Sequence, residues 1–202
     1  MVNLSYIHPN KGSQKEPSNN MLKNILNYAH YLLQQTISKG ETVIDATCGN
    51  GNDTLFLSEL VGEEGHVLAF DIQEQAIDNT KQKLADNQCS NVTLIHDSHE
   101  NINSYVDPKL AGHLGGAIFN LGYLPKSDKK VITKGESTTA AIESILPQLK
   151  KKGLVILVIY HGHDGGKDEK NAVLNYVIHL DQKKYKVLRY GFINQKNNPP
   201  FI

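Results

Sequence analysis

The 202-residue sequence has almost no arginine, few cysteines and no net charge. Basic and acidic residues number 21 each, and Arg189 is the only arginine among them. A formal net charge of zero excludes a protein that binds polyanions over its whole surface, so any contact with nucleic acid has to come from a local patch. A single guanidinium also limits bidentate recognition of phosphate groups or guanine bases.

Long apolar runs and patterned cysteines are absent as well. The longest clear apolar run, Leu154 to Tyr160, is much shorter than the roughly 20 residues of a membrane-spanning helix. The N-terminus lacks the apolar core of a signal peptide. Cys48 and Cys89 follow neither a metal-binding nor a redox spacing. These absences predict a cytoplasmic protein with reduced thiols and no membrane partner.

The rest of the composition is that of one globular domain. Hydrophobic residues make up 39% of the chain and charged residues 21%, and 202 residues are enough for a substantial core. Residues 1–20 are polar and contain Pro9, Gly12 and Pro17, so we expect a flexible N-terminal extension there. Patterned sequence begins at Met21, and we place the folded domain at residues 21–202.

One stretch near the start of the domain predicts a nucleotide-binding unit. Thr42 to Ala46 is typical of a buried strand, Gly49 and Gly51 follow it, and Thr54 to Leu60 has the spacing of a helix with one apolar face. The glycines let the backbone approach a ligand closely, and the helix N-terminus offers free N–H groups. Because a lone Gly-x-Gly is weak evidence, a plain turn between strand and helix is the alternative.

An acidic residue at the end of the next strand strengthens this interpretation. His66 to Phe70 is the predicted strand, and Asp71 follows about 20 residues after the glycines, where a carboxylate accepts hydrogen bonds from ribose hydroxyls. The dinucleotide fingerprint needs a third glycine where this chain has Thr54, which argues against a hydride-transferring dehydrogenase. The spacing from Asp45 to Gly51 instead resembles motif I of the class I S-adenosylmethionine (SAM)-dependent methyltransferases.

Predicted strands and helices alternate along the chain. This order predicts a Rossmann-like α/β fold with a doubly wound, mostly parallel sheet covered on both faces, and an antiparallel C-terminal strand as in class I methyltransferases. We expect Ser137 to cap its helix and Lys150 to Lys152 to end it. The expected strands are 42–46, 66–71, 91–95, 117–121, 154–160 and 186–193, and the expected helices are 21–38, 53–61, 73–87, 138–151 and 170–182.

Ligands of such sheets bind in the loops at the carboxyl ends of the strands. By resemblance to the methyltransferase class, Asp97 faces the adenine amino group of SAM with Ser98 beside it. The alternative is that both residues only cap a helix that begins near His99. The predicted cofactor site consists of Asp45, Cys48, Gly49, Asn50, Gly51, Asn52, Asp53, Asp71, Ile72, Asp97, Ser98, His99 and Asn120.

The loop after the fourth strand, Asn120-Leu-Gly-Tyr-Leu-Pro125, resembles the Asn-Pro-Pro-Tyr motif of methyltransferases that act on amino nitrogens. The resemblance implies that the Asn120 oxygen and the Leu121 carbonyl accept hydrogen bonds from the target amine, and that Tyr123 stacks on the target base. Such acceptors aim the nitrogen lone pair at the methyl group. Leu121 and Gly122 replace the two prolines of the motif. A buried asparagine that ends a strand and a core tyrosine are the alternative.

The fifth loop contains His161, Gly162, His163 and Asp164. A His-x-His-Asp cluster is found in zinc hydrolases, but here Gly165 stands where a further histidine would directly follow the Asp, and no later ligand run appears. We therefore favour a polar substrate loop over a metal site and expect no metal. His161 is our candidate for removing a proton from the substrate, because its ordinary pKa lies near neutrality. His163 is expected to contact substrate.

A local basic loop follows the predicted target motif. Lys126, Lys129, Lys130 and Lys134 lie there with Asp128 as their only opposing charge. This placement suits contacts with an RNA backbone. An ordinary solvated loop is the alternative reading of the lysines.

Taken together, residues 21–202 resemble the rRNA methylase family of class I SAM-dependent methyltransferases. The matching segments are 45–54, 96–99, 120–125, 160–163, 192–195 and 198–201. Bacterial members of the family include a tRNA methyltransferase, so the resemblance implies methylation of the aminomethyl nitrogen of 5-aminomethyl-2-thiouridine at the wobble position of the tRNA anticodon stem-loop. Asn120, Tyr123 and His161 would carry the chemistry. An N-methyltransferase of rRNA or of a small amine, and a SAM-binding module without catalysis, are the alternatives, and a homodimer is compatible with each.

Overall fold

A computed structural model describes residues 22–122, 133–162, 165–196 and 199–202. Its elements, in chain order, are α1 (Ile25–Thr36), β1 (Thr42–Asp45), α2 (Asn52–Val61), β2 (His66–Asp71), α3 (Glu74–Asp86), β3 (Val92–His96), η1 (His99–Ser104), η2 (Pro108–Leu110), β4 (Leu114–Leu121), α4 (Gly135–Ile145), η3 (Leu146–Gln148), β5 (Leu149–Ile159) and α5 (Gly166–Ile178).

The five strands form one parallel sheet in the order β3-β2-β1-β4-β5. The chain builds outward from β1 to β3, then crosses over and builds from β4 to β5 on the other side. The carboxyl ends of β1 and β4 therefore meet at the point where the strand order reverses, which is where doubly wound sheets bind their ligands.

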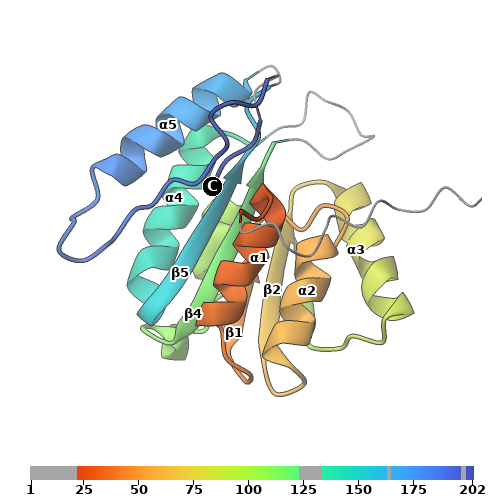
Figure 1. The fold of residues 1–202 in the computed structure, drawn as a ribbon. Coiled ribbons are helices and arrows are strands. Elements are labelled where there is room, and N and C mark those ends of the chain that lie inside the picture. The colour runs from red at the N-terminus through yellow and green to blue at the C-terminus, as the bar shows by residue number, and fades with distance from the viewer. Residues whose placement is uncertain (1–21, 123–132, 163–164, 197–198) are drawn as a thin grey trace, which may run out of the picture.

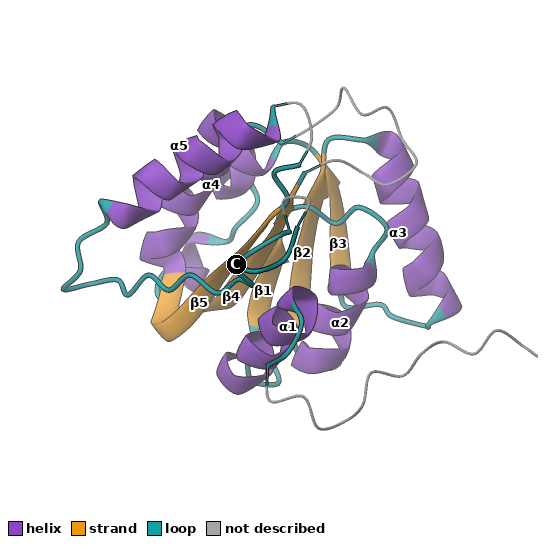
Figure 2. Cartoon of the chain, turned by 45° about the horizontal axis from the view of Figure 1, so that its top comes forward, coloured by secondary structure: helices purple, strands orange, loops and turns teal. Residues whose placement is uncertain are grey.

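Helices cover both faces of the sheet (Figures 1 and 2). One core contains the buried side of α1, with Ala29 and Leu33, and the inward residues of α2. The other core lies under α4 and α5 and includes Ile142 and Val173. Neighbouring strand residues such as Val43 and Ile44 divide between the two cores because side chains along a strand alternate in direction.

The predicted antiparallel C-terminal strand is not formed. The described part of residues 186–193 contains no strand, and the sheet is parallel throughout. Phe201 makes a single antiparallel bridge to Ile159 at the edge of β5, and Tyr190 pairs with Ile202. Pro199 and Pro200 have no N–H to donate, so the ladder cannot continue past Phe201 in that direction.

Residues 149–152 were predicted wrongly as the end of a helix and lie in β5. Ser137 does not cap α4, because its hydroxyl donates to the Lys134 carbonyl. Pro147 ends the helical segment in the short η3, and Lys150 lies in β5, where its ammonium pairs with Glu41 at 2.5 Å. Their charge alone suggested that these lysines end a helix. The partner of Lys150 is Glu41, which lies in a loop far away in the sequence.

Candidate active site

The carboxyl ends of the strands border a cavity of about 1040 Å³. Residues of α1 and the first turn of α4 complete its wall. The lining residues are Leu26, Asn27, His30, Ala46, Thr47, Cys48, Gly49, Asn50, Asn52, Asp53, Asp71, Ile72, Gln73, Asp97, Ser98, His99, Glu100, Asn120, Gly122, Thr133, Lys134, Glu136, Ser137 and Tyr160.

The turn after β1 is held by the acidic residue at the end of β2. The Gly49 N–H donates to Asp71 Oδ2 at 3.0 Å, and the Gly49 carbonyl accepts from the Thr80 hydroxyl at 3.2 Å. Gly51 has a φ of +73°, and a Cβ there would lie 3.0 Å from the Thr80 Cα. Burial raises the pKa of Asp71, although backbone hydrogen bonds act in the opposite direction. The turn and this carboxylate thus form one preorganised wall of the cavity.

Asp45 lies beneath this turn and does not line the cavity. It is fully buried, and it accepts hydrogen bonds from the Thr54 hydroxyl at 2.6 Å and the Thr47 N–H at 3.2 Å. Burial, together with the nearby charge of Asp53, raises the pKa of Asp45 to about 7. Asp45 therefore ties the end of β1 to the start of α2, and its contact with a cofactor stays a prediction.

Asp97 lies in the loop after β3, just before the short helix η1. It lines the cavity, and it also accepts hydrogen bonds from the Asn101 amide at 2.9 Å and the Tyr105 hydroxyl at 2.8 Å. These bonds lower the pKa of Asp97, the Asn101 bond most strongly. Ser98 caps η1 by accepting from the Glu100 N–H at 3.4 Å. The loop is thus rigid, and its contact with adenine stays a prediction.

His99 is buried at the cavity wall with its ring edge-on to Phe119. Its Nδ1 lies 3.1 Å from the Ala46 carbonyl oxygen, and a carbonyl only accepts, so Nδ1 carries the proton. Burial lowers the pKa of His99, which favours the neutral ring. Its Nε2 therefore holds a lone pair, and no described residue donates to it.

Asn120 is held at the end of β4 from two sides. Its backbone N–H donates to the Thr47 hydroxyl at 2.7 Å, and its side-chain amide nitrogen donates to Asp53 Oδ2. Asp53 in turn contacts His30 of α1, with 2.5 Å between Oδ1 and Nε2. The Asn120 amide oxygen is buried, and no described residue donates a hydrogen bond to it.

The segment after Asn120 is fastened where it leaves the sheet. The Gly122 N–H donates to the Thr133 hydroxyl at 3.0 Å, and the Gly122 carbonyl accepts from the Thr133 N–H at 3.1 Å. Thr133 also donates to buried Glu169 at 2.7 Å, and Thr138 donates to the same carboxylate at 3.1 Å. Burial raises the pKa of Glu169. Gly122 and Thr133 thus bracket residues 123–132 at the cavity.

Most of the predicted site residues reach the cavity wall, and a few do not. Those that do not line it are Asp45, Gly51, Leu121 and His161, and the His161 ring lies edge-on to Phe201 at 5.6 Å. Five further predicted residues lie outside the described part of the chain, namely Tyr123, Lys126, Lys129, Lys130 and His163.

Sequence reasoning missed the contribution of α1. Leu26, Asn27 and His30 line the cavity, yet this helix precedes the glycine turn and carries no recognised motif. In the sequence, the only signal at His30 is a polar residue that directly follows Ala29, which lies on the buried side of the helix. Tyr160 also lines the cavity, and burial raises its pKa.

Two further features concern membranes and metals. Within the described ranges, no helix is both long and apolar enough to cross a membrane. The same ranges hold no group of three or more histidine, cysteine, aspartate or glutamate side chains that could bind a metal ion.

Comparison with protein families yields two matches. Residues 67–202 match the family described as "Putative rRNA methylase", and residues 3–110 match the family described as tRNA (Uracil-5-)-methyltransferase. The first match contains β2 to β5, α4 and α5, and hence the Asp71, Asp97 and Asn120 loops of the cavity.

Individual relatives agree with the first family. A chloroplastic tRNA (mnm(5)s(2)U34)-methyltransferase of Arabidopsis thaliana is 35% identical over 183 residues, an alignment that contains 86% of this chain and 66% of that protein, just under two thirds of its length. A crystal structure titled as a "putative rRNA-methylase" from Clostridium thermocellum is 45% identical with a TM-score of 0.86, and the match covers 90% of this chain and 96% of that one. A "putative methyltransferase" from Streptococcus mutans, solved in complex with SAH, is 44% identical with a TM-score of 0.81 and the same coverage. The chain belongs to the rRNA methylase family.

Proposed function

We propose that this protein is a SAM-dependent N-methyltransferase that converts 5-aminomethyl-2-thiouridine, or 5-aminomethyluridine, to its methylaminomethyl form at position 34 of tRNA. The observation that carries the proposal is the Asn120 amide oxygen, which is a buried acceptor without a donor among the described residues of the cavity. Buried acceptors are rarely left unpaired, so a ligand N–H is the expected partner. The Arabidopsis relative is named for this modification.

The cavity suits SAM together with a second ligand. Its volume of about 1040 Å³ lies at the upper end of the roughly 300–1,000 Å³ that single small-molecule sites occupy. The preorganised turn at Gly49 and the Asp71 carboxylate lie where a nucleoside ribose binds in this fold. SAM supplies an electrophilic methyl group when it is bound. The Streptococcus mutans relative was solved with SAH, the demethylated product of SAM.

The residues around Asn120 would then prepare the nucleophile. An alkyl amine attacks only through a neutral nitrogen, so the site has to favour loss of its proton. A hydrogen bond from the amine to Asn120 Oδ1 would orient the nitrogen and leave its lone pair available. In this proposal Tyr123 stacks on the uracil ring, and His161 remains the candidate proton acceptor although it does not line the cavity.

The proposed partner is the anticodon stem-loop of tRNA. Lys134 lines the cavity next to Thr133, and Lys126, Lys129 and Lys130 precede it in the sequence. Lysines at the mouth of a cavity would contact phosphates of the loop that presents the base. Cytoplasmic location and a homodimeric state belong to the same proposal, and light scattering of the purified protein would test the second.

The test is methyl transfer to tRNA that carries 5-aminomethyl-2-thiouridine. We expect nucleoside mass spectrometry to show one added methyl group on that nucleoside when the protein and SAM are present, and no product with Asn120→Ala at unchanged SAM affinity. Asn175→Ala, an exposed change on α5, is the matched control. Methylation of rRNA or a small amine instead would replace the substrate class, and equal loss of SAM binding and transfer in Asn120→Ala would favour a binding module.

A further inference from the structure

We infer that His30 and Asp53 are positioning residues that orient the Asn120 amide, so that its oxygen faces the ligand and the site selects a nucleophile that carries a hydrogen-bond donor. The inference rests on the proposed N-methyltransferase function and adds the residues that set the polarity of its acceptor. The three side chains come from α1, from the first turn of α2 and from the end of β4. Each of them lines the cavity.

The Asp53 carboxylate decides which end of the Asn120 amide is free. An ionised carboxylate only accepts hydrogen bonds, so the Asn120 nitrogen has to face Asp53 Oδ2, as it does in the structure. The amide oxygen is thereby left as the unpaired atom. If the amide turned over, its oxygen would meet the carboxylate and its N–H₂ group would face the ligand. The ligand would then need an acceptor such as a carbonyl oxygen.

His30 fixes Asp53 from the other side. Its Nε2 lies 2.5 Å from Asp53 Oδ1, and the side chains are 29% and 11% exposed, so water screens the pair only in part. The His30 ring stacks on Phe56, with 3.9 Å between the ring centroids and 5° between the planes. A ring held on its face and at its nitrogen keeps the carboxylate in one orientation. The second oxygen of Asp53 can therefore serve Asn120.

This arrangement explains why α1 takes part in the site. A helix that only covered the sheet would need its buried residues, such as Ala29 and Leu33, and no polar contact with α2. His30 instead reaches across to Asp53 between the two helices. Orienting an acceptor by a fixed chain of hydrogen bonds costs no reorganisation when the substrate binds.

The test uses His30→Ala, His30→Gln and Asp53→Asn in the full chain. We expect Asp53→Asn and His30→Ala to lower kcat for aminomethyl-tRNA at least about tenfold, with SAM affinity within about twofold, because a misplaced acceptor affects orientation more than binding. A glutamine side chain can donate to Asp53 as the imidazole does, so His30→Gln should recover most of kcat. A role in folding alone would not produce this split or the rescue.

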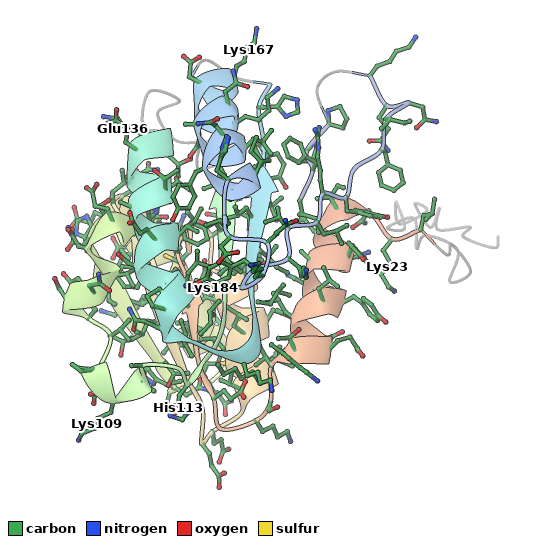
Figure 3. All side chains as sticks on the ribbon, turned by 90° about the vertical axis from the view of Figure 1, so that its left-hand side faces the viewer. Lys23, Lys109, His113, Glu136, Lys167 and Lys184 are labelled. Carbon is green, nitrogen blue, oxygen red and sulfur yellow. The ribbon has the colours of Figure 1, made fainter. Side chains whose placement is uncertain are left out.

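Two control variants and two contrary results complete the test. Asp78→Asn on α3 and His113→Ala make the same chemical changes at exposed positions and should leave kcat unchanged. His113 lies at the end of the molecule opposite Glu136 and Lys167, two residues near the cavity end (Figure 3). Unchanged kcat in Asp53→Asn, or no recovery in His30→Gln, would overturn the inference.

A readout without substrate separates this inference from the proposed function. The side-chain amide protons of Asn120, observed by NMR with selective labelling, should be protected from solvent exchange in the wild type. We expect the protection to be lost in Asp53→Asn and in His30→Ala and restored in His30→Gln. Protected amide protons in a wild type that methylates no amine would refute the function alone. Amide protons that exchange freely in an active wild type would refute the inference alone.

Discussion

At the level of single residues, a carboxyl group with a raised pKa supports the glycine turn. The pKa of Asp45 is about 7 in the folded chain, against an ordinary value of 3.8. The folded state therefore retains a proton that the unfolded state releases, and the contribution of Asp45 to stability is complete below about pH 4 and lost as the pH rises through about 7. Ionisation of Asp45 beneath the cavity is therefore expected to lower the free energy of unfolding as the pH rises.

We expect Asp45→Asn to change the pH dependence of folding. The amide has no proton to lose, so the unfolding free energy of the variant should gain about 2–3 kcal/mol relative to wild type between pH 5 and pH 8. Urea unfolding at both pH values measures the difference. Asp78→Asn, at an exposed position, should follow the wild type. Parallel pH profiles of Asp45→Asn and wild type would contradict the assignment.

Two glycines with positive φ differ in what surrounds them. Gly51 has a φ of +73° and packs against Thr80, whereas Gly40 has a φ of +83° and no atom within 4 Å of a Cβ built on it. Gly40→Ala should cost about 1 kcal/mol from the backbone conformation alone. Gly51→Ala should cost about 2–3 kcal/mol and weaken SAM binding, because the turn has to move away from α3. Calorimetry measures the stability and the SAM affinity of each variant. Equal losses of stability in Gly40→Ala and Gly51→Ala would contradict the close approach of Gly51 to Thr80.

At the level of elements, two threonines and Glu169 join the end of β4 to α4 and α5. Thr133 accepts from the Gly122 N–H and donates to Glu169, which lies in the first turn of α5. The end of β4 therefore depends on two helices that lie far from it in sequence. Hydrogen bonds that involve a charged group contribute about 1.5–3 kcal/mol each, so this small cluster matters for both stability and loop position.

We expect Thr133→Val to loosen the loop without affecting the cofactor. Valine keeps the shape but leaves the Gly122 N–H without a partner and removes one of the two hydroxyl donors of Glu169, which should lower stability by about 1–3 kcal/mol and raise KM for tRNA. SAM affinity should stay the same, because Thr133 bonds to Gly122 and Glu169 and not to the glycine turn. Thr133→Ser retains the hydroxyl and should restore both properties. An unchanged KM in Thr133→Val would show that the loop is positioned without this bond.

On the scale of the whole molecule, the C-terminal segment closes the edge of the sheet. Phe201 is 4% exposed, packs in the core under α4 and α5, and pairs with Ile159 of β5 through both backbone groups. The end of the chain is therefore part of the core rather than a separate strand. Its removal should affect cooperative unfolding of the domain.

Phe201→Ala is expected to destabilise the domain by about 3–5 kcal/mol, as for other buried phenylalanines. The matched control is Ile193→Ala, because Ile193 is fully exposed in the same segment and its loss should change stability by less than about 0.5 kcal/mol. Urea unfolding of both variants measures the difference. A stability loss in Phe201→Ala no larger than in Ile193→Ala would show that the segment is not part of the core.

The amino-acid sequence by itself determined the fold class and pointed to most of the residues that line the cavity. Alternating apolar patterns predicted the five parallel strands, and Gly49, Gly51 and Asp71 marked the turn and the acid, because local periodicity and backbone freedom are encoded within a few neighbouring residues. Asn120 was predicted on other grounds, namely the resemblance of residues 120–125 to the Asn-Pro-Pro-Tyr motif of methyltransferases that act on amino nitrogens.

Only the tertiary structure decided which side chains meet. His30 and Asp53 are 23 positions apart, and Asp53 and Asn120 are 67 apart, so no local pattern joins them. Asp45 is fully buried beneath the turn and does not line the cavity, and Lys150 pairs with Glu41 in place of ending a helix. Hydrogen bonds and burial of this kind depend on chain segments that approach one another only after the sheet has assembled, and a reading along the chain cannot reveal them.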